Sequence, residues 1–174
     1  MKKFLFFSFC LAFISISVHG QNLTTTIKVQ AMEMAKALIR NDFANFSKYM
    51  HPKVVELAGG KENMKNKMDS ADIMMKQFGA SFKKILIGDP GEIISYKNTL
   101  QSVVPQTTTV QSMMGDLIAE TSLIAFSTDK GKNWYFIDTN AYQVGKLKSI
   151  LPYLSPGLVI PPRKKPQMVP GNKN

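Results

Sequence analysis

The period of the apolar residues changes at Gly79, and this change limits the possible folds more than any other feature of the sequence. Before Gly79, apolar residues recur three and four positions apart, which is the period of an amphipathic helix. After it, they alternate between short turns, which is typical of antiparallel strands. A run of helices followed by a run of strands predicts an α+β domain, with helices packed on one face of an antiparallel sheet.

The helical half contains one segment with a regular apolar stripe. Residues 61–79 carry apolar side chains spaced 4, 3, 4 and 3 apart, which predicts a long helix with a buried face and a C-cap at Gly79. The stripe consists of Met64, Met68, Ala71, Met75 and Phe78. Further helices are expected at residues 27–40, capped by Thr24–Thr26, at 43–50, ended by His51-Pro52, and at 142–151.

The strands are expected to leave one apolar face of the sheet uncovered. They are expected at residues 54–58, 82–87, 92–96, 100–111, 116–127 and 133–139. In residues 116–127, one face carries Leu117, Leu123 and Ala125, and the other carries Ile118, Ile124 and Phe126. Because helices are expected on one face only and Glu120 and Ser122 interrupt the Ile118 face, we take the Ile118 face as the outer one and predict a homodimer through it.

The first 20 residues have the layout of a secretory signal peptide. Lys2 and Lys3 precede an apolar run of 15 residues, Phe4 to Val18, which is shorter than the ~20 residues that a membrane-spanning helix needs. Cys10, the only cysteine, lies inside this run and follows Phe7-Ser8-Phe9, so a lipoprotein is not expected. The sequence therefore predicts cleavage near Gln21, a secreted or periplasmic protein without disulfides, and no transmembrane segment after signal removal.

The rest of the chain divides into a domain and a tail. Residues 21–154 are long enough for one α+β domain, and residues 155–174 contain five of the nine prolines and no acidic residue. The chain has 22 basic and 12 acidic residues, a net charge of +10, but residues 21–160 carry only +4. We interpret 155–174 as a flexible Pro/Lys-rich tail, and export argues against nucleic acid as its partner.

Two side chains are candidate acid–base catalysts, each with a structural alternative. His51 is the only histidine after the leader, which excludes paired-histidine metal sites; it is either a general base or a ring that caps a helix end. Asp138 shares a strand face with Trp134 and Phe136, which would raise its pKa and make it a general acid. Alternatively, Asp138 caps the turn that follows it. Tyr49 is the candidate hydrogen-bond donor.

A binding site without catalysis uses several of the same residues. Methionines of residues 61–79, Met68 among them, are either pocket-lining residues for an apolar ligand or core contacts. The candidate ligand-binding residues are Tyr49, His51, Met68, Trp134 and Phe136. No Gly-rich phosphate loop and no metal-ligand set is present in the sequence, so no cofactor and no metal are expected.

Three stretches carry a resemblance to a known superfamily. They are similar to segments of nuclear-transport-factor-2-like proteins. The stretches are residues 41–46 with 49–52, residues 54–58 with Gly59-Gly60 and the helix after them, and the strands at 106–109, 117–127 and 134–138. This superfamily includes ketosteroid isomerases and polyketide cyclases. The likeness covers residues 26–151, and it implies helices on a curved, cone-shaped (cystatin-like) sheet. The strand Gly131–Thr139 resembles the last strand of small secreted bacterial members without an assigned activity.

These observations favour an exported, non-catalytic domain that binds a small apolar ligand or a protein partner. The alternative is an isomerase, dehydratase or hydrolase that uses the cone cavity, with Asp138 and His51 as the acid–base pair. The position of Asp138 distinguishes the two. A catalytic role needs its carboxylate within hydrogen-bonding distance of Tyr49 or His51, whereas a cap on the turn at Ala141 favours the binding domain.

Overall fold

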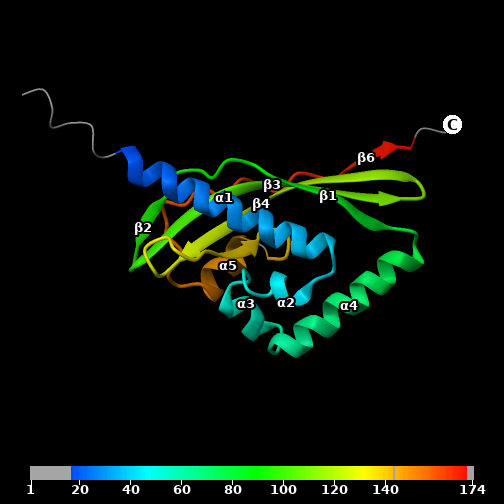
Figure 1. Cartoon of the computed structure of the whole chain (residues 1–174), viewed down its shortest axis with the longest axis horizontal. Helices are drawn as coiled ribbons and strands as arrows, with labels where there is room; N and C mark the ends of the chain where they lie inside the picture. Colours follow the sequence, from blue (N-terminus) through cyan, green and yellow to red (C-terminus); the bar gives the residue numbers. More distant parts are fainter. Residues whose placement is uncertain (1–16, 143, 172–174) are drawn as a thin grey trace, which may run out of the picture.

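A computed structural model describes residues 17–142 and 144–171, and it is an α+β fold: helices come first, and a six-stranded antiparallel sheet follows (Figure 1). The helices are α1 (Ser17–Ile39), α2 (Phe43–Phe46), α3 (Pro52–Leu57), α4 (Lys61–Gln77) and α5 (Val144–Ile150). The strands are β1 (Ser81–Ile87), β2 (Ile94–Tyr96), β3 (Thr99–Ser112), β4 (Gly115–Ser127), β5 (Tyr135–Asp138) and β6 (Gln167–Pro170). Within the described residues, no helix is long and apolar enough to cross a membrane.

A long hairpin forms the centre of the sheet. Strands β3 and β4 pair from Leu100 opposite Ser127 to Ser112 opposite Gly115. On the far side of β3 lie β1 and β2, and on the far side of β4 lie β5 at one end and β6 at the other. The expected strands at 82–87, 92–96, 100–111, 116–127 and 133–139 therefore exist, with small shifts of their ends.

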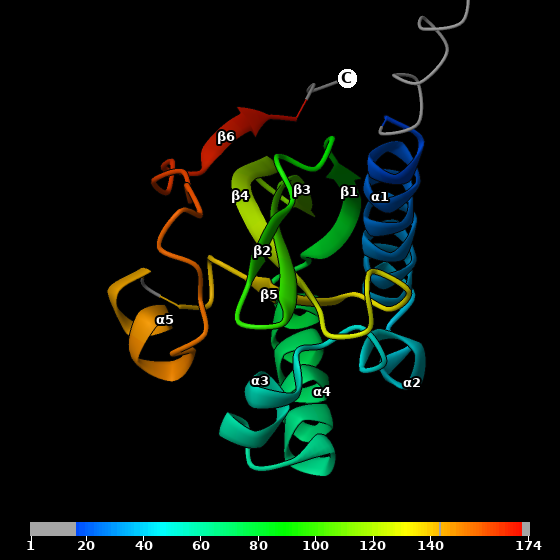
Figure 2. The same ribbon diagram turned by 90° about the vertical axis from the view of Figure 1, so that its left-hand side faces the viewer.

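Apolar layers of the same chain cover both faces of the sheet. Helix α1 packs Ile27, Ala31 and Met34 against Leu123 and Ala125 of β4. On the opposite face, Ile124 and Phe126 pack against residues of α3, α5 and the segment after α5. Figure 2 shows the sheet between α1 on one side and α5 on the other.

Because both faces of the sheet are covered within one chain, the structure does not support the homodimer prediction. The Ile118 face was expected to be uncovered, yet Ile124 and Phe126 of that face are buried within the single chain. The cover comes from Leu147, Leu151 and Leu154, because the chain after β5 crosses back over the sheet. Assigning helices to one face only was wrong.

The chain passes from one face to the other around the edge of β5. Met50 forms a parallel bridge with Phe136; the Phe136 N–H donates to the Tyr49 carbonyl (2.7 Å), and the His51 N–H donates to the Phe136 carbonyl (3.2 Å). After His51, the expected strand at 54–58 is instead helix α3. Pro52 occupies the first turn of α3, where its missing N–H costs nothing, and His51 is the N-cap, so local capping overrides the β-propensity of Val54-Val55.

Two other helices differ from expectation in extent or burial. Helix α1 begins at Ser17, so Thr24–Thr26 lie inside it and do not cap it. Helix α4 and its C-cap region match the prediction, with Gly79 at φ +61°, but the stripe is buried at its start only. Met64 is buried, Met68 is half-buried, and Ala71 and Phe78 are exposed. The C-terminal half of α4 extends away from the two apolar layers (Figure 1).

The segment after residue 154 lies against the domain, whereas the sequence predicts a flexible tail. Leu158 and Ile160 pack on the α5-side layer, Arg163 donates to the Thr139 carbonyl (2.8 Å), and Lys164 pairs with Glu120 (2.5 Å). Strand β6 then adds to β4, with Val169 opposite Asp116. The buried Gln101 amide explains the start of this course: it donates to the Tyr153 carbonyl (2.7 Å) and accepts from the Ser155 N–H (2.9 Å).

The two-sided core predicts that Ile124→Lys unfolds the protein. The substitution buries an unpaired ammonium group under α5, at a cost of more than about 4 kcal/mol. Ile73→Lys, at an exposed position of α4, is the matched control and should cost less than about 0.5 kcal/mol. Thermal unfolding followed by circular dichroism measures both. A folded, monomeric Ile124→Lys protein would contradict the burial of this face.

Truncation separates the two parts of the C-terminal segment. Ending the chain at Ile160 removes exposed residues and should lower the free energy of unfolding by about 1 kcal/mol or less. Ending it at Pro152 also removes both main-chain partners of Gln101 and buried Leu154, and should cost about 3 kcal/mol or more. Urea titration of the two truncated proteins measures the difference. Equal losses would show that Gln101 does not hold this segment.

Candidate functional site

His51 is a buried helix cap. Its Nδ1 accepts a hydrogen bond from the Lys53 N–H at the start of α3 (3.1 Å), so the proton of the neutral ring resides on Nε2 and points to the Tyr153 hydroxyl (3.1 Å). The ring lies edge-on to Phe126, with centroids 4.9 Å apart, and stacks on Tyr153. Of the two roles considered for His51, the structure shows the cap.

The surroundings of His51 keep it uncharged. Burial lowers the pKa of the imidazole from 6.5 to about 4, because the apolar surroundings destabilise the imidazolium. Burial also raises the pKa of the Tyr153 hydroxyl, and the charge of Glu56 adds to that rise. At neutral pH the pair is therefore a neutral hydrogen bond between α3 and the segment after α5.

Asp138 terminates β5 and caps the following turn. Its Oδ1 accepts from the Asn140 N–H (2.7 Å), its carbonyl accepts from the Ala141 N–H (3.1 Å), and its Oδ2 accepts from the Gln106 side chain (3.3 Å). Burial raises the pKa of Asp138, while the bonds from Asn140 and Gln106 and the charge of Arg163 act against that rise. The structure thus shows the turn-capping role.

The proposed acid–base pair is not assembled. Asp138 lies opposite Leu123 on the α1 face of the sheet, with Phe136, whereas the His51 ring packs on Phe126 on the other face. Tyr49 is half-buried against the α1-side layer. The two side chains therefore lie on opposite faces of the sheet, with the backbone of β5 between them.

The candidate ligand-binding residues belong to the packed interior. Trp134 and Phe136 are buried in the α1-side layer, and the Trp134 indole N–H donates to the Gly131 carbonyl (3.0 Å). Met68 packs on the same layer from α4, whereas the His51 ring lies on the other face. These residues do not share one cavity wall.

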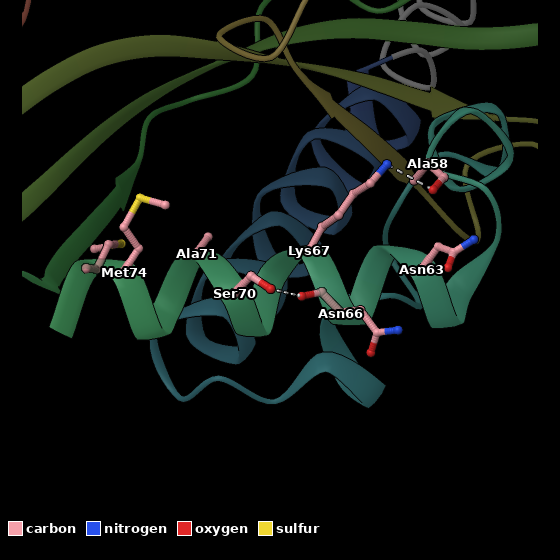
Figure 3. A pocket seen from close by; sticks show the side chains of 8 residues that line it. Ala58, Asn63, Asn66, Lys67, Ser70, Ala71 and Met74 are labelled. Atoms are coloured by element: carbon pink, nitrogen blue, oxygen red, sulfur yellow. Dashed lines mark hydrogen bonds between the residues drawn. The ribbon is translucent and has the colours of Figure 1, made fainter. Parts of the chain in front are cut away.

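An open groove along α4 is a concave surface among the described residues (Figure 3). Its volume is about 610 Å³, and its wall consists of Ala58, Asn63, Asn66, Lys67, Ser70, Ala71, Met74 and Met75. Helical spacing explains the set, since Asn63, Lys67, Ser70 and Met74 recur every three or four residues and share one face. Four of these residues are polar, but most of the exposed surface of the wall is apolar.

The two ends of the groove differ in chemistry. At one end, Lys67 donates to the Ala58 carbonyl (3.1 Å), and Asn63 donates to the Gly59 carbonyl (2.9 Å). At the other end are Ala71 and Met74 (Figure 3), and Met75, which follows Met74 in α4, also lines the groove. Lys67 has no carboxylate within salt-bridge distance among the described residues. The groove therefore combines an uncompensated positive charge with an apolar floor.

Sequence analysis identified this groove only in part, through the methionines of residues 61–79. Met75 of the stripe and the neighbouring Met74 line the groove, whereas Met64 and Met68 pack on the two apolar layers. The available signal was Met74, an apolar residue outside the stripe on an otherwise polar face. Among the residues that the structure describes, no cluster of three histidine, cysteine, aspartate or glutamate side chains suits a metal ion.

Comparison with known proteins assigns no family. No protein-family model matches the chain, and a search of curated proteins finds no significant match.

The buried cap predicts a pH dependence of stability. Because the pKa of His51 is about 4 in the folded protein and about 6.5 in the unfolded chain, the unfolded chain binds the proton more readily. The contribution of neutral His51 to the free energy of unfolding is fully present above pH 6.5. It is lost as the pH falls toward 4, and the loss is on the order of 3 kcal/mol. Urea titrations at pH 4 and pH 7 measure it. His51→Asn keeps a capping oxygen but cannot titrate, so its pH dependence over this range should be smaller by that amount.

Proposed function

We propose that the protein is a non-catalytic binding domain that presents the α4 groove to an apolar segment of a protein partner. The observation that carries the proposal is the composition of the wall: Ala71, Met74 and Met75 are apolar, and Lys67 has no carboxylate partner among the described residues. Methionine side chains adapt to varied apolar partners, as in other helix-binding surfaces. The preferred segment is amphipathic and carries a carboxylate that meets Lys67.

The shape of the groove favours a protein segment over a small enclosed ligand. Sites for small molecules bury most of the ligand in a closed pocket. Here α4 and Ala58 form the wall, and the opposite side is open. An extended or helical segment of a larger partner fills such a groove while the rest of the partner remains outside.

A catalytic function has less support. The separation of Asp138 from His51 by the sheet removes the acid–base pair on which it depended. His51 is already engaged on both ring nitrogens, by the Lys53 N–H and by Tyr153. The enzyme alternative would need a different set of residues.

Export and a nuclear-transport-factor-2-like fold complete the proposal. The layout of residues 1–20 supports export to the periplasm or medium. The order of N-terminal helices, the long helix α4 and the antiparallel strands β3, β4 and β5 supports the superfamily. The helix at Pro52–Leu57 departs from it, because the resemblance implied a strand there.

Selection of peptides against the groove tests the proposal. Random 12-residue peptides displayed on phage are selected on the wild-type protein and synthesised. We expect apolar sequences with one or more acidic residues, and binding to Met74→Ser should be at least about tenfold weaker, since the substitution removes the apolar contact at the groove end. Lys67→Gln should weaken binding about three- to tenfold. Fluorescence anisotropy measures the dissociation constants.

Ile73→Ser is the matched control for the selected peptides. Ile73 and Met74 are adjacent on α4 and almost equally exposed, at 58% and 59%, but only Met74 lines the groove. Peptides that bind Ile73→Ser and Met74→Ser with equal affinity would place the binding surface elsewhere. A small molecule that native mass spectrometry detects on the purified wild type but not on Met74→Ser would change the ligand class from peptide to small molecule.

A further inference from the structure

The turn between β3 and β4 carries two strongly exposed apolar side chains. Met113 is 84% exposed and Met114 is 75% exposed. The turn does not need them: Ser112 Oγ donates to the Gly115 carbonyl (2.9 Å) and accepts from the Met114 N–H (3.2 Å), and Gly115 has a φ of +127°. Polar residues are usual at such positions, because the turn conformation and water favour them.

Other exposed apolar residues lie beside this turn. Met113 packs over Gly79, which follows Phe78 at the end of α4, and Phe78 is 68% exposed. Val169 of β6 lies against Gly115 on the other side. Figure 1 shows the turn, the end of α4 and β6 at the same end of the molecule. The tip patch, as defined here, consists of Phe78, Met113, Met114, Met168 and Val169.

Cations surround the tip patch in excess over anions. Lys83 pairs with Asp116, Lys76 with Asp72, and Lys164 with Glu120. Lys84 on β1 and Lys165 next to β6 have no acidic partner among the described residues. An apolar surface bordered by unpaired cations is complementary to a surface with a negatively charged boundary and an apolar interior.

We propose that the tip patch docks the protein on an anionic lipid bilayer. Met113 and Met114 would enter the boundary between headgroups and acyl chains, while Lys84 and Lys165 remain at the level of the lipid phosphates. The two contributions are individually weak, so the association is reversible and salt-dependent. This docking is independent of the α4 groove, because Phe78 and the β3–β4 turn do not line the groove.

Flotation with lipid vesicles tests the docking. The full chain is mixed with vesicles of phosphatidylcholine alone or with 30% (about one lipid in three) phosphatidylglycerol, a composition that makes the surface strongly anionic. We expect binding to the anionic vesicles, loss of that binding at about 0.5 M salt, and little binding to neutral ones. Met113→Ser/Met114→Ser should weaken binding about tenfold or more, and Lys84→Gln/Lys165→Gln about tenfold.

Two controls make the result specific to the tip patch. Lys130→Gln/Lys132→Gln removes two charges at the other end of β4, roughly 40 Å along the strand, and should leave binding unchanged. Residues 1–16 are common to every variant, so any contribution from them cancels. A fluorophore on Met114→Cys, with Cys10→Ser, should shift to the blue on anionic vesicles, and the same label on exposed Val159→Cys should not.

Three outcomes would overturn the proposal. One is equal binding by the Met113→Ser/Met114→Ser and Lys130→Gln/Lys132→Gln variants. Another is a label at position 114 that stays in water when vesicles are present. The third is a wild-type dimer in light scattering that Met113→Ser/Met114→Ser converts to a monomer, which would make a second copy of the chain the occupant of the tip patch.

Discussion

The two apolar faces of β4 impose the main constraint on this fold. Leu123 and Ala125 point to one side and Ile124 and Phe126 to the other, so a sheet built on this strand needs two covers. Helix α1, which precedes the sheet in the sequence, covers one face. The chain after β5 covers the other. The crossing at Met50, which pairs with Phe136 at the edge of β5, lets residues 43–58 contribute to both layers.

Buried polar groups hold the second cover in place. Gln101 is fully buried, and its amide donates to the Thr99 hydroxyl and the Tyr153 carbonyl and accepts from the Ser155 N–H. An unpaired amide at this position would cost about 1–3 kcal/mol, so the segment after α5 has one favoured path across the sheet. The His51–Tyr153 hydrogen bond connects the same segment to α3. These hydrogen bonds thereby fix where the second cover lies, and the burial of its apolar side chains stabilises it.

The sequence predicts the parts of this architecture that depend on local patterns. The alternation in residues 82–127 and the turn glycines predict the strands, and the stripe from Met64 predicts α4. The helical state of 52–57 was missed because His51-Pro52 was interpreted as the end of one helix, whereas this pair begins the next. The second cover was also missed. Leu151, Leu154 and Leu158 recur three and four residues apart around Pro152, but their partners Ile124 and Phe126 are about 30 residues earlier, and sequence alone does not pair them.

The candidate site was harder to predict than the fold, and the reason is physical. His51, Asp138, Trp134 and Phe136 were chosen because their chemistry is rare in this chain, yet the same properties suit them to structural roles. A ring nitrogen that accepts a backbone N–H caps α3, a carboxylate closes the turn after β5, and two large rings fill the α1-side layer. Because these groups are used inside the domain, the surfaces proposed for partners are apolar ones that the fold leaves exposed. These are the Met74 side of α4 and the β3–β4 turn, where methionines remain exposed although no local contact requires them.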